Sequence, residues 1–432
     1  ITLLVEVILL AVLQLGQHSP ERRLLLQLVM VMLPFMPLIC MVAIAAGMLQ
    51  VNGRFAAAAS GPIILNGFII AVGGYYILND DHADTRIAFA LGVATVLSAG
   101  THLLWFLRLL RRTGQVRWTR DLSPARSEAR DMARKFGPVA IGLGTLQLNT
   151  FLDTAIATFP LWFDTARKGI RFPLDEASNA ILALTSRLYQ FPLGVFGIAI
   201  ASAAFPLLAR HADEPGKFLD TLRRGLRLSL FIGLPATLGL ALVRHDLVAV
   251  LYGYGRESFD AESLLRSAAV LLGFAPGVWA YSLNHVFTRA FYARGDTRTP
   301  MNISILCMFI NIGLNLSLIW MLREAGMALA TSLSAVLQCA ILAALARKRL
   351  VTGPLLDRDA IRAAVRIVIA SAAMAAAVFL TQQLFFSSRG TTWRAQCLAL
   401  AVCCGVGIAI YLAAAVVLRI TELRQLASRR AA

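Results

Sequence analysis

Residues 25–49 read LLQLVMVMLPFMPLICMVAIAAGML and contain no charged side chain. A helix needs about 20 consecutive apolar residues to cross the roughly 30 Å hydrocarbon core of a bilayer, and this stretch is long enough. Comparable stretches recur at residues 226–243, 361–384 and 397–418. Inside a bilayer only α-helices and closed β-barrels satisfy their own backbone hydrogen bonds, and the sequence lacks the ten-residue alternating segments of barrel strands. The sequence therefore predicts a helical membrane protein.

The composition of the whole chain agrees with this interpretation. Of the 432 residues, 58% are hydrophobic and 15% are charged, and the mean hydropathy is +0.69. A soluble domain of this length would need more polar side chains to cover its surface. We predict an all-α, polytopic transmembrane bundle of about twelve spans. The predicted spans are residues 1–15, 25–49, 61–78, 87–110, 137–163, 177–207, 226–243, 264–288, 301–321, 325–346, 361–384 and 394–418.

The formal net charge of +17 comes largely from basic residues in alternate loops. Cytoplasmic loops of membrane proteins carry an excess of Lys and Arg, so these loops and both ends of the chain are predicted to be cytoplasmic. This distribution explains the charge without a nucleic-acid partner. The acidic segment NDDHAD, residues 79–84, then faces outward. The basic segments are 111–135, 210–227, 289–298, 347–362 and 419–430.

The longest polar interruption predicts the domain organisation. Residues 113–136 are rich in charges of both signs and contain Ser123-Pro124, which is typical of an amphipathic linker on the cytoplasmic surface. It separates a partial N-terminal lobe of four spans, residues 1–112, from a C-terminal lobe of six spans, residues 137–346. Two additional spans and a cytoplasmic tail follow at 347–432. Because the chain begins at Ile1 inside an apolar stretch, we expect that an N-terminal piece precedes it.

Charged residues inside the spans are the first candidates for function, because a lone charge at mid-bilayer costs several kcal/mol. Arg187 lies well inside the span 177–207. Its guanidinium could bind a phosphate through two parallel hydrogen bonds, and a structural role is the alternative. Asp153, in the preceding span, could pair with Arg187 or bind a cation together with Asn149, one helical turn earlier.

A second polar group lies in the later spans. Asn311 and Asn315 are one helical turn apart, which places two amides on one helix face, and Thr331 in the next span could add a third oxygen ligand. Hydrogen bonding between helices is the other interpretation. The six cysteines lie in predicted spans without metal-ligand spacing, so no metal site is firmly assigned.

Several spans contain helix breakers that a simple membrane anchor would not need. Transporters use broken or bent helices where the backbone lines a cavity or moves during gating. We predict a gating or hinge role for Pro192, Gly194 and Pro235. Ordinary helix kinking is the alternative.

Four segments, in order along the chain, carry a family resemblance: NGRFAAAASGPIILN (52–66), QLNTFLD (147–153), SRLYQFPLGVFGIAI (186–200) followed by FPLL (205–208), and RAFYARGDTRTP (289–300). They resemble motifs of the MurJ/MviN lipid II flippases, a family of the multidrug/oligosaccharidyl-lipid/polysaccharide exporter superfamily. The resemblance covers essentially the whole chain, and its two specific motifs are those that begin at Ser186 and Arg289.

The resemblance implies a fold of fourteen spans, in which two six-helix lobes surround a central cavity and two final helices border a lipid-tail groove. The present spans would be the third to the fourteenth. It also implies an activity: flipping of lipid II, the undecaprenyl-pyrophosphate-linked peptidoglycan precursor, from the inner to the outer leaflet of the bacterial cytoplasmic (inner) membrane by alternating access. Arg187 matches the cavity arginine of the second lobe and would contact the pyrophosphate.

A sodium site of some family members matches Asp153, Asn311 and Asn315, with Thr331 nearby, although Asn315 stands where some relatives have Asp. No cofactor is expected besides Na⁺ or the membrane potential as a driving force. The expected partners are lipid II, membrane lipids and enzymes of peptidoglycan synthesis. The alternatives are an exporter of another polyprenyl-linked saccharide or of drugs, or a non-transporting membrane scaffold. An enzyme is not expected, because the sequence lacks HExxH, paired-carboxylate, Cys-His and phosphate-loop motifs.

Overall fold

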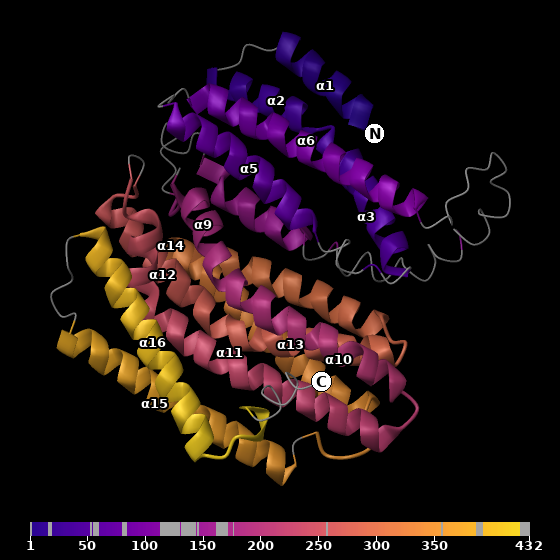
Figure 1. Cartoon of the computed structure of the whole chain (residues 1–432), viewed down its shortest axis with the longest axis vertical. Helices are drawn as coiled ribbons and strands as arrows, with labels where there is room; N and C mark the ends of the chain where they lie inside the picture. The colour runs from indigo at the N-terminus through magenta and orange to yellow at the C-terminus, as the bar shows by residue number, and fades with distance from the viewer. Residues whose placement is uncertain are drawn as a thin grey trace. The chain divides into compact units, whose positions relative to one another are not determined.

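The structure, a computed structural model, separates into two compact units, Ile1–Arg126 and Ser127–Ala432 (Figure 1). Throughout the residues that it describes, the regular elements are helices and no strand occurs. The predicted all-α class is therefore confirmed. The described residues are 2–15, 20–51, 54, 60–79, 84–112, 130, 144, 147–160, 172–175, 177–255, 258–355, 357–385 and 392–423.

In its described residues, the first unit contains five helices: α1 (Thr2–Leu15), α2 (Pro20–Met32), α3 (Phe35–Val51), α5 (Gly61–Leu78) and α6 (Asp84–Arg111). A turn that includes Pro34 separates α2 from α3, as expected for a residue that lacks a backbone N–H. Helix α6 packs against α2, α3 and α5. Its contact with α3 is formed by apolar side chains that include Leu49 and Phe106, both fully buried.

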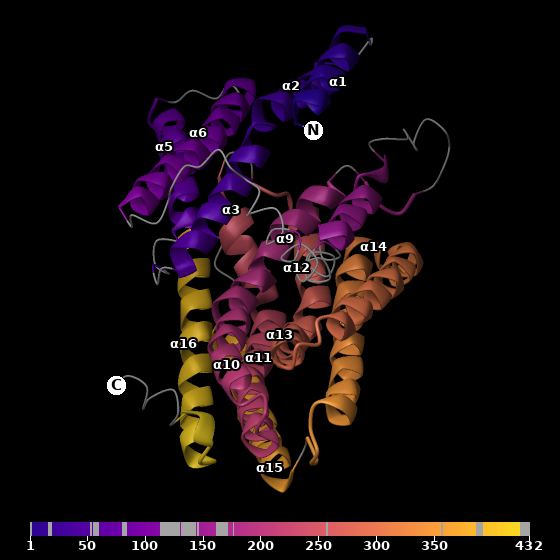
Figure 2. The ribbon, with the colours of Figure 1, turned by 90° about the vertical axis from the view of Figure 1, so that its right-hand side faces the viewer.

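The second unit begins, in its described part, with a helical stretch at residues 147–157. Later elements pack against one another as a bundle around α11, α13 and α14 (Figure 2). They are α9 (Ser178–Pro192), η1 (Leu193–Ile198), α10 (Ala199–Arg210), α11 (Pro215–Tyr252), α12 (Ala261–Phe274), η2 (Ala275–Gly277), α13 (Val278–Ala293), α14 (Arg298–Arg349), α15 (Arg358–Phe385) and α16 (Trp393–Val417).

Nine helical segments in the described residues are long and apolar enough to cross a membrane. One of them, α14, has 52 residues, and Arg323 interrupts it with φ 54° and ψ −132°. It therefore contains both predicted spans 301–321 and 325–346. The predicted span 1–15 corresponds to the shorter helix α1, and the span 137–163 lies partly outside the described residues. The protein is a multi-pass membrane protein.

The predicted linker, residues 113–136, lies outside the described residues except at Arg130. The boundary between the two compact units falls within this segment. The four-part division into lobes, linker and final spans stays a prediction.

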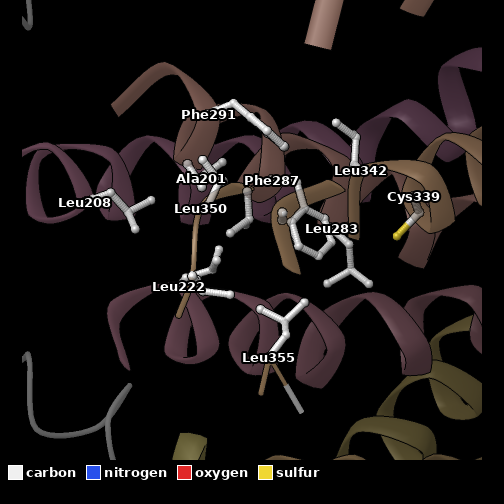
Figure 3. Packing of buried hydrophobic residues seen from close by; sticks show 14 of the residues in the cluster. Ala201, Leu208, Leu222, Leu283, Phe287, Phe291, Cys339, Leu342, Leu350 and Leu355 are labelled. Atoms are coloured by element: carbon white, nitrogen blue, oxygen red, sulfur yellow. The ribbon is translucent and has the colours of Figure 1, made fainter. Parts of the chain in front are cut away.

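Interdigitated side chains hold the second unit together (Figure 3). Leu208 of α10, Leu222 of α11, Phe287 and Phe291 of α13, and Leu342 of α14 are at most 3% exposed. Between helices in a bilayer, close packing and hydrogen bonds provide the association energy, because lipid tails are as apolar as the side chains. Helices α15 and α16 pack on each other and on α11, where the Tyr411 hydroxyl donates a 2.5 Å hydrogen bond to the Phe231 carbonyl.

Candidate functional site

A cavity of about 380 Å³ in the second unit brings together Asp153, Arg187 and Thr331. Its volume lies within the range of small-molecule binding sites. The polar side chains of Asn179 and Gln190 also line it. Three of the residues singled out in the sequence therefore share one cavity.

The position of Arg187 follows from the amphipathic pattern of α9. Ile181, Thr185 and Tyr189 are buried, each one helical turn after the last, so they form the packed face of the helix. Arg187 lies on another face and is exposed on the second unit. It has no ion pair or hydrogen bond to any residue that the structure describes. A guanidinium inside a membrane-spanning segment is thus left available to a ligand.

Asp153 lies at the centre of a hydrogen-bond cluster. The Asn315 Nδ2 donates to Asp153 Oδ1 at 2.6 Å and to Asn311 Oδ1 at 3.1 Å. The Asn149 Nδ2, one helical turn earlier, donates to Asp153 Oδ2 at 3.1 Å, and the binding of a cation by this pair stays a prediction. The expected pairing of Asp153 with Arg187 is not formed. Although both line the cavity, the carboxylate is occupied by the two amides.

Thr331 is close to this cluster but is bonded elsewhere. Its hydroxyl donates to the Met327 carbonyl at 3.0 Å, as threonines in helices commonly do. It lines the Arg187 cavity and also a smaller neighbouring cavity to which Asn311 contributes. The structure therefore joins Asp153, Asn311 and Asn315 directly and places Thr331 beside them.

The chemistry of the cluster fits a cation with oxygen ligands. Buried amide oxygens at Asn149 Oδ1 and Asn315 Oδ1 have no hydrogen-bond partner within the described part of the chain. Leaving a buried acceptor unpaired costs about 1–3 kcal/mol. A hard cation prefers carboxylate and amide oxygens of this kind. The described residues contain no group of three or more His, Cys, Asp or Glu side chains suited to a transition metal.

The predicted hinge residues lie in two differently built helices. Pro192 ends α9 and is followed by the π-helical turn Leu193–Ile198, in which Gly194 is exposed. Wide turns of this kind inside helices are frequent at functional sites. Pro235 lies in the interior of α11, which stays helical from Pro215 to Tyr252. The helix therefore widens after Pro192, and α11 continues without a break through Pro235.

A charged network between α9, α12 and α14 was not predicted. Arg266 donates to both carboxylate oxygens of Asp175, at 2.8 and 2.9 Å, and also contacts the buried Glu324. Arg323 donates to Asp175 Oδ2 at 2.8 Å. The Ser178 hydroxyl hydrogen-bonds to Glu324 as well. The only sequence signal was that Arg323 and Glu324 interrupt a long apolar stretch.

This network controls the protonation of Asp175, which lies in the loop before α9. Partial burial alone would raise the pKa of this carboxyl. The hydrogen bonds from Arg266 and Ser178, together with the positive charges of Arg266 and Arg323, outweigh that effect and lower the pKa to about 2. Asp175 is therefore ionised at neutral pH.

The motif RAFYARGDTRTP forms the turn that begins α14. Asp296 accepts hydrogen bonds from the Thr299 backbone N–H at 2.9 Å and from its hydroxyl at 2.7 Å. Gly295 has a φ of +76°, a conformation that suits glycine. Arg349, at the end of α14, donates to the Thr299 hydroxyl at 2.9 Å. The motif thus ties together the two ends of this bent helix.

A sequence model of the family described as "Lipid II flippase MurJ" matches residues 1–400. The chain belongs to the MurJ family. The probable lipid II flippase MurJ of Vibrio cholerae is 30% identical over 314 residues, covering 72% of this chain and 55% of the relative. The probable lipid II flippase MurJ of Rhizobium meliloti is 30% identical over 354 residues, covering 81% and 62%. The chain spans somewhat more than half the length of these curated MurJ relatives.

Solved structures share the MurJ family's fold. The structure titled as lipid II flippase MurJ in an inward closed conformation matches with a TM-score of 0.71, covering 97% of this chain and 82% of that chain at 19% identity. An inward-facing multidrug resistance MATE family transporter of the MOP superfamily matches with a TM-score of 0.62, covering 81% and 78% at 14% identity. The predicted membership of the MurJ family is confirmed, and these solved structures show the same fold.

Proposed function

We propose that this MurJ family member flips lipid II from the inner to the outer leaflet of the bacterial cytoplasmic membrane by alternating access. Membership of the family supports the substrate class. The observation that carries the proposal is the guanidinium of Arg187, which lines a cavity of the membrane-spanning second unit and has no ion pair or hydrogen bond with the residues that the structure describes. A charge at this depth is costly without an anionic partner or water, and a pyrophosphate is a matching partner.

Arg187 suits the pyrophosphate because its planar guanidinium can donate two parallel hydrogen bonds to phosphate oxygens. Asn179 and Gln190, which line the same cavity, offer further donors. Only the polar head of the substrate needs this shelter, since the polyprenyl tail can stay in lipid. The protein would act as a transporter rather than as an enzyme, with no bond of the substrate broken.

Two further features of the second unit would serve transport: its hinges would permit the conformational change, and a cation site would supply a driving force. The π-helical turn after Pro192, which includes Gly194, and the part of α11 around Pro235 would act as hinges as the lobes open to alternate sides. Asp153, Asn311 and Asn315, with Thr331 nearby, would bind Na⁺. Because Asp153 lines the cavity of Arg187, a bound cation would change the charge that the substrate meets. Membrane potential offers a second source of energy, about 2.3 kcal/mol per unit charge at 100 mV.

The orientation follows from the distribution of basic loops, with both chain ends in the cytoplasm. Enzymes that build and polymerise the precursor would be the functional partners on the two sides of the membrane. The lobe arrangement 1–112, 137–346 and 347–432, joined by the linker 113–136, would supply the moving parts.

Complementation tests the proposal in cells depleted of their own lipid II flippase. The complete gene that encodes this chain is expected to restore growth, whereas its Arg187→Ala variant is expected to fail at equal membrane levels. Arg210→Ala is the matched control, because it removes an exposed arginine from the end of α10, away from the cavity lining. Failure of the unchanged gene would instead favour another polyprenyl-linked saccharide or a drug as substrate, or a scaffold role.

A further inference from the structure

A second charged cavity, of about 370 Å³, lies between α11, α15 and the residues that follow α16. It shares no lining residue with the Arg187 cavity. Figure 1 shows α15 and α16 side by side in the second unit. The cavity lies at the end of these helices where Arg358 begins α15 and Arg419 follows α16. Five of its eight lining residues are charged: Arg227, Asp359, Arg362, Arg366 and Glu422.

Among the described residues, the ion pairs in this cavity leave one positive charge without a partner. Arg227 Nε lies 2.9 Å from Glu422 Oε1, and Glu422 is buried. Arg362 Nη1 lies 3.4 Å from Asp359 Oδ1. Arg366 has no ion pair with any residue in the described ranges. The lining therefore carries three guanidinium groups against two carboxylates.

The arrangement on α15 strengthens this excess of positive charge. Arg358, Arg362 and Arg366 are spaced four residues apart, so they lie along one face of the first turns of the helix, and all three are exposed. Like charges at this spacing destabilise a helix by a few tenths of a kcal/mol per pair. An anion bound between the guanidinium groups would offset this repulsion. The charge pattern therefore points to an anionic ligand.

The surface beside the cavity indicates that the ligand also has acyl chains. Val365, Val368 and Ile369 of α15 are 52%, 53% and 50% exposed. Charged side chains thus give way to exposed apolar ones within two turns of the same helix. This transition is what a membrane helix shows at the boundary between headgroups and hydrocarbon.

We propose that this cavity binds the phosphate headgroup of an anionic phospholipid. Arg362 and Arg366 donate charge-assisted hydrogen bonds to the phosphate, and the acyl chains follow the exposed apolar face of α15. Basic pockets between transmembrane helices near the membrane surface suit such headgroups. The lipid comes from the leaflet on the side of the basic loops. The site is independent of lipid II transport.

Native mass spectrometry of the purified full chain tests the proposal by counting the lipids retained after detergent release. Phosphatidylglycerol and phosphatidylcholine with identical acyl chains are offered at equal concentration. We expect several-fold greater retention of phosphatidylglycerol, and about a fivefold loss of that preference in Arg366→Gln, since one arginine near an anionic surface has an effect of this size. Arg394→Gln, an exposed arginine at the other end of α16, is the matched control and should leave the preference unchanged.

Three results would overturn the proposal. Equal retention of the two lipids would show that headgroup charge is not recognised, and equal effects of Arg366→Gln and Arg394→Gln would show that the preference is not located in this cavity. The third result comes from a competition measurement, in which inorganic phosphate is added at matched ionic strength. If it displaces phosphatidylglycerol at equal concentration, the site binds a free phosphate and not a lipid. Size-exclusion profiles of both variants verify that they are folded. We expect both to fold, because the two replaced side chains are exposed.

Discussion

Replacing Arg266 by glutamine is expected to destabilise the second unit by about 3 kcal/mol. The side chain of Glu324 is only 3% exposed, and its carboxylate contacts Arg266 and the Ser178 hydroxyl. Removing one partner of a buried ion pair costs about 3–5 kcal/mol, because the other charge remains buried. The expected loss lies at the lower end of this range, since Arg266 is itself 14% exposed and the Ser178 hydroxyl remains.

Reversible unfolding in mixed micelles with increasing sodium dodecyl sulfate measures this loss. The double variant Arg266→Gln, Glu324→Gln leaves no buried unpaired charge at this pair, so the two changes should be non-additive by about 2 kcal/mol. Glu214→Gln is the control, because it breaks a 2.6 Å pair with Lys217 in which both side chains are at least half exposed, and it should have no measurable effect. A loss in Arg266→Gln no larger than in this control, or strict additivity in the double variant, would refute the reasoning.

Three further predictions concern packing, pH and cation binding. A Cβ added at Gly273 would lie 2.8 Å from a carbonyl oxygen of α14, whereas a Cβ added at Gly239 would have no atom within 4 Å. Gly273→Ala should therefore lower the midpoint of thermal unfolding, and Gly239→Ala should leave it unchanged or raise it. Equal midpoints for the two variants would contradict this expectation. Because the pKa of Asp175 falls from 3.8 to about 2 on folding, the carboxylate contributes stability above pH 4 that is lost as the pH falls towards 2. Unfolding midpoints should therefore drop over this window in the unchanged protein and less in Asp175→Asn, and parallel profiles would speak against it. Asn315→Asp adds a second anionic ligand, so Na⁺ should stabilise this variant against unfolding more than K⁺ does. Asp153→Asn should abolish the stabilisation by Na⁺. If the unfolding midpoint of Asp153→Asn still depended on Na⁺, this site would be excluded.

The helical membrane fold was predictable because the bilayer imposes a simple rule on sequence. Spans such as 226–243 and 361–384 are recognisable by length and apolarity alone, and α11 and α15 contain them. Details that depend on backbone register were not predictable. The π-helical turn Leu193–Ile198 has no signature in hydropathy, because it does not change the polarity of the sequence. The charged pair Arg323-Glu324 separates the predicted spans 301–321 and 325–346, but hydropathy does not specify the positive φ of Arg323.

The candidate site divides in the same way. The contact of Asn149 with Asp153 and that of Asn311 with Asn315 follow from the four-residue helical spacing, which sequence shows directly. The hydrogen bond of Asn315 to Asp153 joins distant parts of the chain. Spacing cannot specify such a contact, and only the family resemblance suggested it. The network around Arg266 was missed for the same reason, since its members come from three separate helices or loops.

The most direct test of the account is a measurement of lipid II flipping with the Arg187 variants. Cells that depend on the complete gene encoding this chain are exposed to a membrane-impermeant reagent that cleaves lipid II at the outer face, and the cleaved fraction is measured. We expect cleavage with the unchanged protein and with Arg210→Ala, and strongly reduced cleavage with Arg187→Ala at equal membrane levels. Undiminished cleavage with Arg187→Ala would contradict the proposal that this arginine binds the substrate pyrophosphate. Absence of cleavage with the unchanged protein would contradict the proposal that the protein flips lipid II.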